Sequence, residues 1–305
     1  MRITPLTPEF ASAWDAFVDR HRAGWFWHRA EWLAYEVAHA GAENLSFMVW
    51  DGDTVFGVVP LLREGTSFSM EGHPLPITLV GSEEARWVMN DEVNRLRLKY
   101  GVVQVGWRTC PLTEWVITPW DPQQWRDISW PSRVLDLTQS EAILHAGVRK
   151  SYRHLINRGR QTWEWWDCAG SPEAFHLLWA EVNGRQRHPD AERLMSDWLK
   201  TGHARLIGAW RGGRWEAFCY ALVYKRRAYY ASGPALVPNV MHALQWNMIL
   251  TLKAEGVELY ELGWGARPGD SDKDRQISFF KAGFGGEDQI VQAVERVFPG
   301  GVHAD

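Results

Sequence analysis

One succession of predicted elements occurs twice along this 305-residue chain. In each occurrence, two amphipathic helices precede two β-rich runs that are joined by a tight turn. The turn is Asp51-Gly52-Asp53 in the first occurrence and Gly212-Gly213 in the second, and both residue types tolerate the left-handed backbone of a hairpin turn. The period is too long for a short-repeat array. It predicts a tandem duplication of one α/β unit.

The N-terminal half carries the first set of elements. Apolar residues recur at helical spacing over residues 8–20 and 31–40, which predicts two helices. A third helix is predicted over 82–100, before a short strand over 102–105.

The C-terminal half repeats this order. Helices are predicted over 172–187 and 190–201, and the second hairpin follows them. A further helix over 240–255 should end before Gly256, because glycine adopts the left-handed conformation that commonly terminates helices.

Chain length is consistent with two domains. At roughly 100–200 residues per domain, 305 residues correspond to two compact domains or one large one. Because proline and tryptophan interrupt the pattern in the middle of the chain, we expect a boundary near 130–145. The predicted domains are therefore 1–140 and 141–305.

Charge and cysteine content exclude several classes of protein. Lys plus Arg total 33 and Asp plus Glu total 37, whereas proteins that coat nucleic acid usually carry a basic excess. Cys110, Cys168 and Cys219 form no CxxC pair, which excludes a disulfide framework and suits a reducing cytosol. The N-terminus does not resemble a signal peptide, and no apolar run approaches the roughly 18 residues of a membrane helix. We expect a cytoplasmic protein with no membrane span and no DNA partner.

Basic side chains crowd residues 148–160, which read VRKSYRHLINRGR. Arg149 and Arg153 lie four residues apart on a predicted helix, and like charges at this spacing mildly destabilise it. An anionic partner would relieve the repulsion, and arginine suits phosphate because it donates two parallel hydrogen bonds. We therefore expect Arg149, Lys150 and Arg153 to bind an anionic group of a substrate. The alternative is a solvated helix face.

A second candidate segment covers 261–286, which read ELGWGARPGDSDKDRQISFFKAGFGG. Gly263 and Gly265 follow a predicted strand, where glycine permits a ligand to approach the backbone closely. Lys281 comes after two phenylalanines, so its cation would lie in a partly apolar setting and could stabilise an oxyanion better than in water. The alternative is a surface lysine beside core Phe279 and Phe280.

Several segments together resemble the FemABX-like transferases of the GNAT acyltransferase superfamily. They are VRKSYRHLINRG, then YYASG followed by ALQWNMILTLKAEGVELYELG, and finally ISFFKAGFGG. The resemblance covers about residues 10–290 and is most specific over 260–286. It implies an α/β fold of two tandem GNAT-like units, each a mixed, mainly antiparallel sheet flanked by helices.

The resemblance also implies acyl or aminoacyl transfer onto an amine. The donor would be acyl-CoA or an aminoacyl-tRNA, without a tightly bound cofactor, and the acceptor a sugar- or peptide-type precursor of cell envelope or polysaccharide. The family's Phe-Lys pair matches Phe280-Lys281, whose lysine would steady the tetrahedral oxyanion. The superfamily's pyrophosphate loop, Arg/Gln-x-x-Gly-x-Gly/Ala, has no match, since SGPALVPN stands at the second expected place. This departure weakens a CoA donor, and the net charge of −4 weakens a tRNA donor.

Other chemistries lack their motifs. The sequence contains no G-x-S-x-G, GxxxxGK[ST] or GxGxxG, which argues against a hydrolase serine, a P-loop and a Rossmann site. Its 11 histidines show no HExxH spacing, so we predict no metal site. His28, His188 and His242 could each act as a base, although a lone histidine is more often structural.

We therefore predict a GNAT-like N-acyltransferase that works by direct transfer. Lys281 would stabilise the oxyanion and Tyr230 would donate a proton or position a substrate. Glu261, Asp272 or Asp274 would remove the amine proton. The expected substrate-binding residues are Phe280, Arg149, Lys150, Arg153, Gly263, Gly265 and Ser232. The alternative is a non-catalytic module that binds a phosphosugar or a peptide without turnover.

Overall fold

The computed structural model describes residues 1–113, 123–267 and 269–299 of the chain. This part contains both helices and strands throughout its length, which confirms the predicted α/β class. None of the helices it describes is both long enough and apolar enough to cross a membrane.

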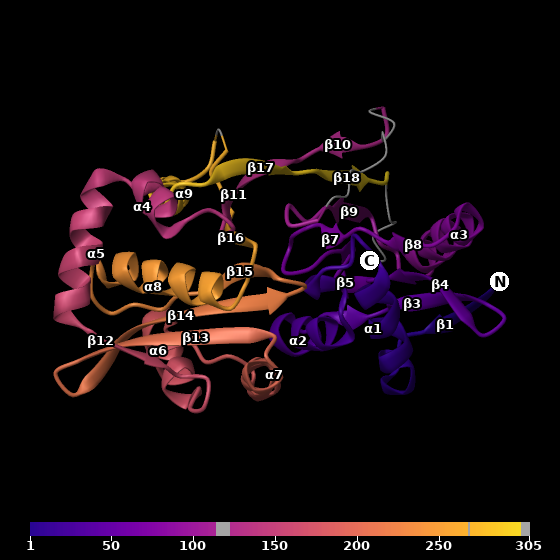
Figure 1. Ribbon diagram of the computed structural model, residues 1–305. Helices are drawn as coiled ribbons and strands as arrows, with labels where there is room; N and C mark the ends of the chain where they lie inside the picture. The colour runs from indigo at the N-terminus through magenta and orange to yellow at the C-terminus, as the bar shows by residue number, and fades with distance from the viewer. Residues whose placement is uncertain (114–122, 268, 300–305) are drawn as a thin grey trace. The chain divides into compact units, whose positions relative to one another are not determined.

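The chain divides into two compact units (Figure 1). Unit 1 comprises Met1–Ser129 and the C-terminal segment that begins at Val291, and unit 2 comprises Trp130–Ile290. Each unit contains a mixed sheet flanked by helices, as predicted.

The two units differ in extent from the expected domains 1–140 and 141–305. Strand β11 (Trp130–Asp136) pairs with β16 (Leu259–Trp264) and so belongs to unit 2. Strand β18 (Ala293–Val297) pairs with β9 and so belongs to unit 1. Both differences depend on pairing between strands that are distant in sequence, which local patterns do not reveal.

Unit 1 begins with the two predicted helices, α1 (Ala11–Arg20) and α2 (Ala30–Ala40). The predicted hairpin follows, and Gly52 in its turn has a φ of +54°, the left-handed conformation that such a turn requires. The hairpin is part of a four-stranded sheet with the order β1-β3-β4-β8. Its strands are β1 (Arg2–Pro5), β3 (Phe47–Asp51), β4 (Thr54–Val59) and β8 (Leu79–Val80).

A second sheet of unit 1 has the order β10-β18-β9-β6-β5-β2, with β7 paired to β9 beside this path. Helix α3 (Glu83–Lys99) begins where Ser82 Oγ accepts a hydrogen bond from the Ala85 amide at 3.1 Å. The strand after it, β9, runs parallel to β6 and β7. The remaining strands are β2 (Glu43–Asn44), β5 (Leu62–Glu64), β6 (Ser67–Phe68), β7 (Leu75–Pro76), β9 (Gln104–Arg108) and β10 (Arg126–Asp127).

Unit 2 contains a seven-stranded sheet with the order β12-β13-β14-β15-β16-β11-β17. Its β15–β16 pair is parallel, whereas β12–β13, β13–β14, β14–β15 and β11–β16 are antiparallel. The predicted second hairpin joins β13 to β14 through Gly212 and Gly213, which have φ values of +59° and +86°. The other strands are β12 (Glu164–Asp167), β13 (Ala204–Arg211), β14 (Arg214–Tyr224), β15 (Arg227–Ser232) and β17 (Glu287–Val291).

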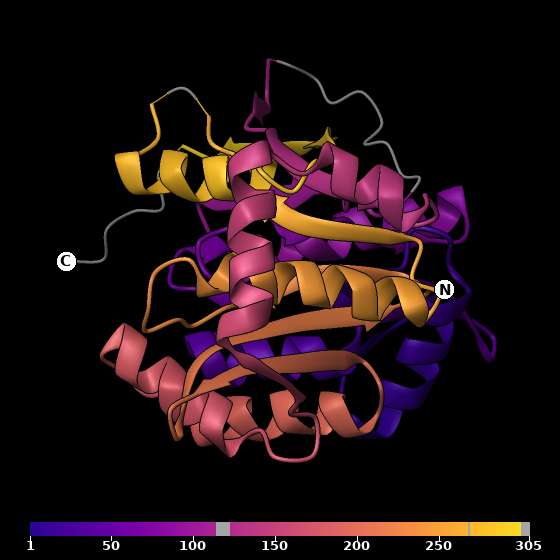
Figure 2. The same ribbon diagram turned by 60° about the vertical axis from the view of Figure 1, so that its left-hand side comes forward.

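Helix α8 (Val240–Ala254) connects β15 to β16 and lies along one face of this sheet (Figure 2). Eight of its residues are buried, so it provides much of the core of unit 2. Gly256 follows its end with a φ of +79°, as predicted. Helix α6 ends at Asn183 before the expected position 187, because Gly184 adopts the left-handed conformation there. The other helices are α4 (Glu141–Gly147), α5 (Lys150–Thr162), α6 (Glu173–Asn183), α7 (Pro189–Lys200) and α9 (Asp272–Ala282).

Candidate active site

The parallel strands β15 and β16 of unit 2 separate part-way along their length. Residues 227–229 pair with 259–261, and the pairing then stops although both strands continue. Each strand keeps its outer partner beyond this point, since Ser232 pairs with Tyr220 and Trp264 with Ser132. The two strands therefore form a fork that opens at their carboxyl ends, where α/β sheets commonly bind ligands.

Gly263 lies in the β16 arm of this fork. Its φ is +85°, and a register shift against β11 beside it marks a β-bulge. A Cβ atom at this position would lie 3.2 Å from Lys281 Nζ and 3.4 Å from the Tyr229 ring. The glycine therefore permits both the bulge and the close approach of the Lys281 ammonium.

Lys281 extends from α9 to the bulge. Its Nζ donates a hydrogen bond to the backbone oxygen of Trp264 at 3.1 Å. Burial lowers the pKa of Lys281 to about 8, although the nearby Glu261 carboxylate opposes this shift. With this pKa the side chain is protonated roughly ten to one at pH 7. The ammonium is thus held in place with capacity to donate further hydrogen bonds.

Glu261 lies two residues before Gly263 and is buried, with 2% of its surface exposed. The Ser132 hydroxyl of the neighbouring strand β11 donates a hydrogen bond to Glu261 Oε1 at 2.5 Å. Ser132 is itself fully buried. The structure therefore brings predicted residues Glu261 and Lys281 together and adds Ser132, which the sequence analysis missed because nothing local indicated that 130–136 would pair with 259–264.

Tyr229 and Tyr230 lie on opposite faces of β15, because side chains alternate along a strand. Tyr229 approaches Gly263 together with Lys281. Tyr230 packs against the core of unit 2 with its hydroxyl against Gly233, and burial raises its pKa, so the phenol stays neutral. The structure thus brings Tyr229 to Lys281 in place of the predicted Tyr230. The sequence YYASG contains the right residue type, but it does not reveal which tyrosine faces α9.

The other predicted residues of the fork segment lie away from Lys281. Asp272 is at the start of α9, exposed, and paired with Arg275 at 2.5 Å. Lys281 lies nine positions further along the helix, about 13 Å along the axis. Asp274 accepts a hydrogen bond from Ser271 at 2.6 Å and helps to begin the helix. Neither carboxylate reaches the ammonium of Lys281.

Two further predicted ligand contacts have partners within unit 2. Ser232 accepts a hydrogen bond from Arg187 Nη2 at 3.2 Å. Gly265 lies against Pro131, where its amide donates to the Pro131 carbonyl at 2.7 Å. Gly265 therefore joins β16 to β11 at the end of the fork.

The basic stretch of α5 separates into internal contacts and exposed charges. Arg153 donates hydrogen bonds to the carbonyls of Val148 and Ala146, both at 2.8 Å, and so caps the end of α4. The Arg149 guanidinium lies 3.6 Å from the centre of the Phe279 ring. Lys150 is exposed. Arg149 and Arg153 thus make contacts within unit 2, whereas Lys150 is exposed, and anion binding by the three stays a prediction.

Phe280 and His242 belong to an aromatic group beside Lys281. Their ring centroids are 5.2 Å apart, and Tyr152 and Phe284 complete the group. Burial lowers the pKa of His242, and the nearby Arg149 guanidinium adds to this effect. Phe280 thus packs in unit 2 and anchors the helical turn that carries Lys281.

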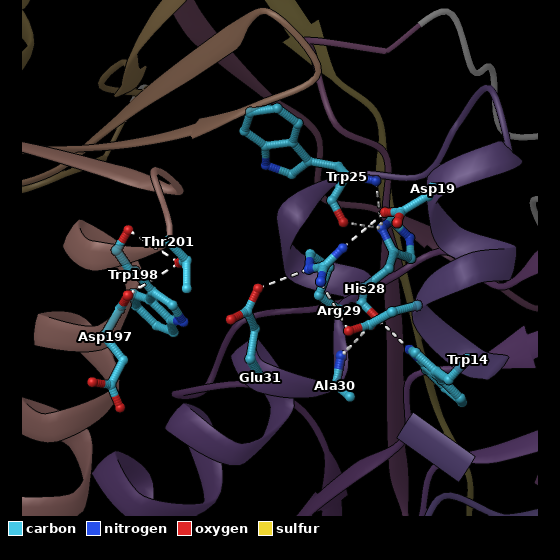
Figure 3. Close-up of polar contacts among 11 residues, drawn as sticks. Trp14, Asp19, Trp25, His28, Arg29, Ala30, Glu31, Asp197, Trp198 and Thr201 are labelled. Atoms are coloured by element: carbon cyan, nitrogen blue, oxygen red, sulfur yellow. Dashed lines mark hydrogen bonds and ion pairs between the residues drawn. The ribbon is translucent and has the colours of Figure 1, made fainter. Parts of the chain in front are cut away.

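The other two histidines have structural positions. His28 of unit 1 is buried and its ring nitrogens contact the backbone oxygens of Trp25 and Ile77. The adjacent Arg29 pairs with Asp19 and Glu31, at 2.8 and 2.7 Å, and so joins α1 to the start of α2 (Figure 3). His188 is exposed, and its Nδ1 accepts a hydrogen bond from the Asp190 amide at the start of α7.

No protein-family model and no curated protein sequence matches the chain. Among solved structures, FemX has a TM-score of 0.67 at 12% identity, over 98% of each chain. The L-PGS of Bacillus licheniformis has a TM-score of 0.63 at 12% identity, over 98% of this chain and 94% of that one.

A tandem GNAT protein from the clavulanic acid biosynthesis pathway has a TM-score of 0.54 at 13% identity, over 97% of this chain and 98% of that one. The chain has the tandem GNAT fold. This finding confirms the predicted duplication and the predicted FemABX-like architecture. In this tandem GNAT chain, the forked β15–β16 pair and Lys281 both belong to unit 2.

Proposed function

We propose that this tandem GNAT protein is an N-acyltransferase that transfers an acyl or aminoacyl group directly to an amine. The observation that carries the proposal is the position of Lys281 Nζ, which is held by the Trp264 carbonyl beside Gly263 at the opening of two parallel strands. A fixed ammonium in a partly buried setting is well suited to stabilise negative charge that develops during a reaction.

The chemistry follows from the groups beside Lys281. The acceptor amine attacks the donor carbonyl, a C–N bond forms, and the carbonyl electrons move to oxygen. Lys281 donates hydrogen bonds to this oxyanion. The intermediate then collapses: the C=O bond re-forms, and the C–S or C–O bond to the donor breaks.

Glu261 is the base in this proposal. Its carboxylate takes the proton of the attacking amine and passes it to the departing sulfur or oxygen. Ser132 fixes the orientation of the carboxylate by the hydrogen bond to Oε1. Burial of both residues excludes the water that would otherwise weaken these interactions.

The donor is a thioester or an aminoacyl-tRNA ester in this proposal, and the acceptor is an amine of a sugar- or peptide-type precursor of cell envelope or polysaccharide. The segment between β15 and α8 favours the aminoacyl-tRNA ester over the CoA thioester. Its Leu236 amide donates to the Glu216 carbonyl at 2.9 Å, and its Pro234 carbonyl accepts from the Phe218 amide at 3.0 Å. This segment therefore extends the sheet, and its Leu236 amide is directed to protein instead of a pyrophosphate.

The test is product formation by the full chain with acetyl-CoA or alanyl-tRNA as donor and glucosamine or a lysine-containing peptide as acceptor. Lys281→Ala should lower turnover by about 10²–10³, as loss of one oxyanion donor does. Lys273→Ala is the matched control, because Lys273 is an exposed lysine of the same helix. A Lys281→Ala variant with more than about a third of wild-type turnover would contradict the assigned role.

A further inference from the structure

A second candidate binding site lies in unit 2, away from Lys281. A cavity of about 290 Å³ lies between the edge strand β12, its neighbour β13 and helix α8. Ser132, Tyr229, Glu261, Gly263 and Lys281 do not line it. The residues that line the cavity include Trp165, Asp167, Arg205, Asn247, Leu250 and Thr251.

Strand register and helical spacing bring these side chains together. Trp165 pairs with Ala209 and Asp167 with Ile207, so Trp165 and Asp167 lie on one face of the sheet with Arg205, two residues before Ile207. Asn247, Leu250 and Thr251 are spaced three and four residues apart, so they share one side of α8. The cavity thus has a sheet wall and a helix wall.

Several polar groups of these walls are available to a ligand. The Trp165 indole N–H is buried and has no hydrogen-bond partner among the described residues. Among the described residues, the side chains of Asn247 and Thr251 also make no hydrogen bond with protein. A buried donor without a partner is costly, and an occupant of the cavity would remove this cost.

The charged groups at the cavity are one guanidinium and two carboxylates, with a net negative charge. Arg205 pairs with Glu255 at 2.8 Å and donates to the carbonyls of Gly202 and Ala204. Asp167 contributes a carboxylate, one oxygen of which accepts a hydrogen bond from the Ala169 amide at 2.9 Å. Two carboxylates beside one guanidinium disfavour a phosphate or another anion.

We propose that this cavity binds a neutral sugar ring. The Trp165 ring provides a flat apolar wall, which suits the C–H face of a pyranose. A carboxylate, an amide and a hydroxyl together accept and donate hydrogen bonds, which suits neighbouring hydroxyl groups of a sugar. The volume lies near the lower end of the range of about 300–1,000 Å³ for ligand pockets, so it suits a single ring.

The site goes beyond acyl transfer and is independent of Lys281. Saturation-transfer NMR on the full chain tests it with four probes: N-acetylglucosamine, glucose, adenosine and inorganic phosphate. We expect saturation of the ring protons of at least one sugar, with a dissociation constant that titration can measure. No transfer to either sugar at tens of millimolar, or tighter binding of adenosine or phosphate, would overturn the proposal.

Variants place the binding in the cavity. Asn247→Leu and Asp167→Ala should each weaken sugar binding at least tenfold, whereas Asn157→Leu, on the exposed side of α5, and Lys281→Ala should leave it unchanged. Thermal melting of each variant shows whether it is folded, and the exposed position of Asp167 keeps that variant informative if Asn247→Leu unfolds. Wild-type affinity in Asp167→Ala, or loss of affinity in Lys281→Ala, would contradict the assigned location.

Discussion

The two units each place a strand of similar sequence after a long helix, but different groups lie against that strand. In unit 1, β9 follows helix α3 and runs parallel to β6 and β7, and in unit 2, β16 follows α8 and runs parallel to β15. The sequence is similar at the same place, since β9 reads Gln-Val-Gly-Trp from Gln104 and β16 reads Glu-Leu-Gly-Trp from Glu261. The duplication thus extends to the individual residues of the strand after the crossover helix.

What differs is the group that lies against the glycine. A Cβ atom on Gly106 would lie 3.2 Å from the Pro74 ring, whereas one on Gly263 would lie 3.2 Å from the Lys281 ammonium. The preceding polar residue differs as well, because Gln104 is exposed and Glu261 is buried. The glycine of unit 2 has a left-handed φ of +85° and lies against a charged ammonium, whereas the glycine of unit 1 lies against a proline ring. In the proposed function, the reactive groups Glu261 and Lys281 both belong to unit 2.

The strongest test of this comparison is Glu261→Gln. The amide keeps the size of the side chain and can still accept the Ser132 hydrogen bond, but it cannot take a proton. We expect turnover to fall by about 10²-fold or more, since general-base catalysis contributes about 10²–10⁴. The pKa of Lys281 should also fall further, because Glu261 opposes its depression. Steady-state kinetics across pH measures both effects.

The matched control is Gln104→Ala in unit 1, which changes the corresponding position of β9. It should leave turnover per folded molecule unchanged. Equal losses in the two variants would show that the difference between the units has no catalytic meaning.

Substitution of Gly263 or Gly106 by alanine is expected to have the next largest effect. Gly263→Ala forces a left-handed φ on a residue with a Cβ, at a cost of roughly 1–2 kcal/mol. It also displaces Lys281, and a displacement of about 1 Å can reduce rates by up to 10²-fold, so we expect at least a tenfold loss of turnover. Gly106→Ala should meet Pro74 and lower the melting temperature while turnover per folded molecule is retained. Kinetics and thermal melting of both variants test these expectations, and a Gly263→Ala variant with wild-type turnover would contradict the role given to Gly263.

The sequence predicted the framework of this comparison better than its details. The repeated order of helices and strands around the two hairpin turns was enough to predict the duplication, because helical periodicity and the turns at Gly52 and at Gly212-Gly213 depend on local sequence. Lys281 and Glu261 could be predicted because they lie in one continuous segment, which begins in a strand that contains glycine.

Residues contributed by another strand could not be predicted in this way. Ser132 reaches Glu261 only because β11 pairs with β16 across 129 positions of sequence. Tyr229 and Tyr230 could not be distinguished, since the face of a strand depends on its register. The contacts of Arg153 with the carbonyls that end α4 were not predicted either, because they depend on how α4 and α5 meet.

The smallest expected effect is a pH dependence of stability in unit 2, because the side chain beside Gly263 is a largely buried lysine, whereas Pro74 beside Gly106 does not titrate. Burial lowers the pKa of Lys281 from 10.5 in a free side chain to about 8. Below pH 8 both the folded and the unfolded chain hold the proton, and the folded chain bears the full cost of the buried ammonium. Between pH 8 and 10.5 only the unfolded chain holds it, so the free energy of unfolding rises with pH.

The measurement compares wild type with Lys281→Met, which removes the titrating group but keeps the apolar stem. The stability difference, wild type minus variant, should be level below pH 7.5 and should rise by on the order of 2 kcal/mol up to pH 10.5, because each tenfold change in proton affinity corresponds to about 1.4 kcal/mol and partial exposure reduces the full value. Other groups titrate in this range, but they are common to both proteins and cancel in the difference. A level difference across the whole range would mean that Lys281 is as well solvated as a surface lysine, and its assignment as a fixed oxyanion donor would lose its physical basis.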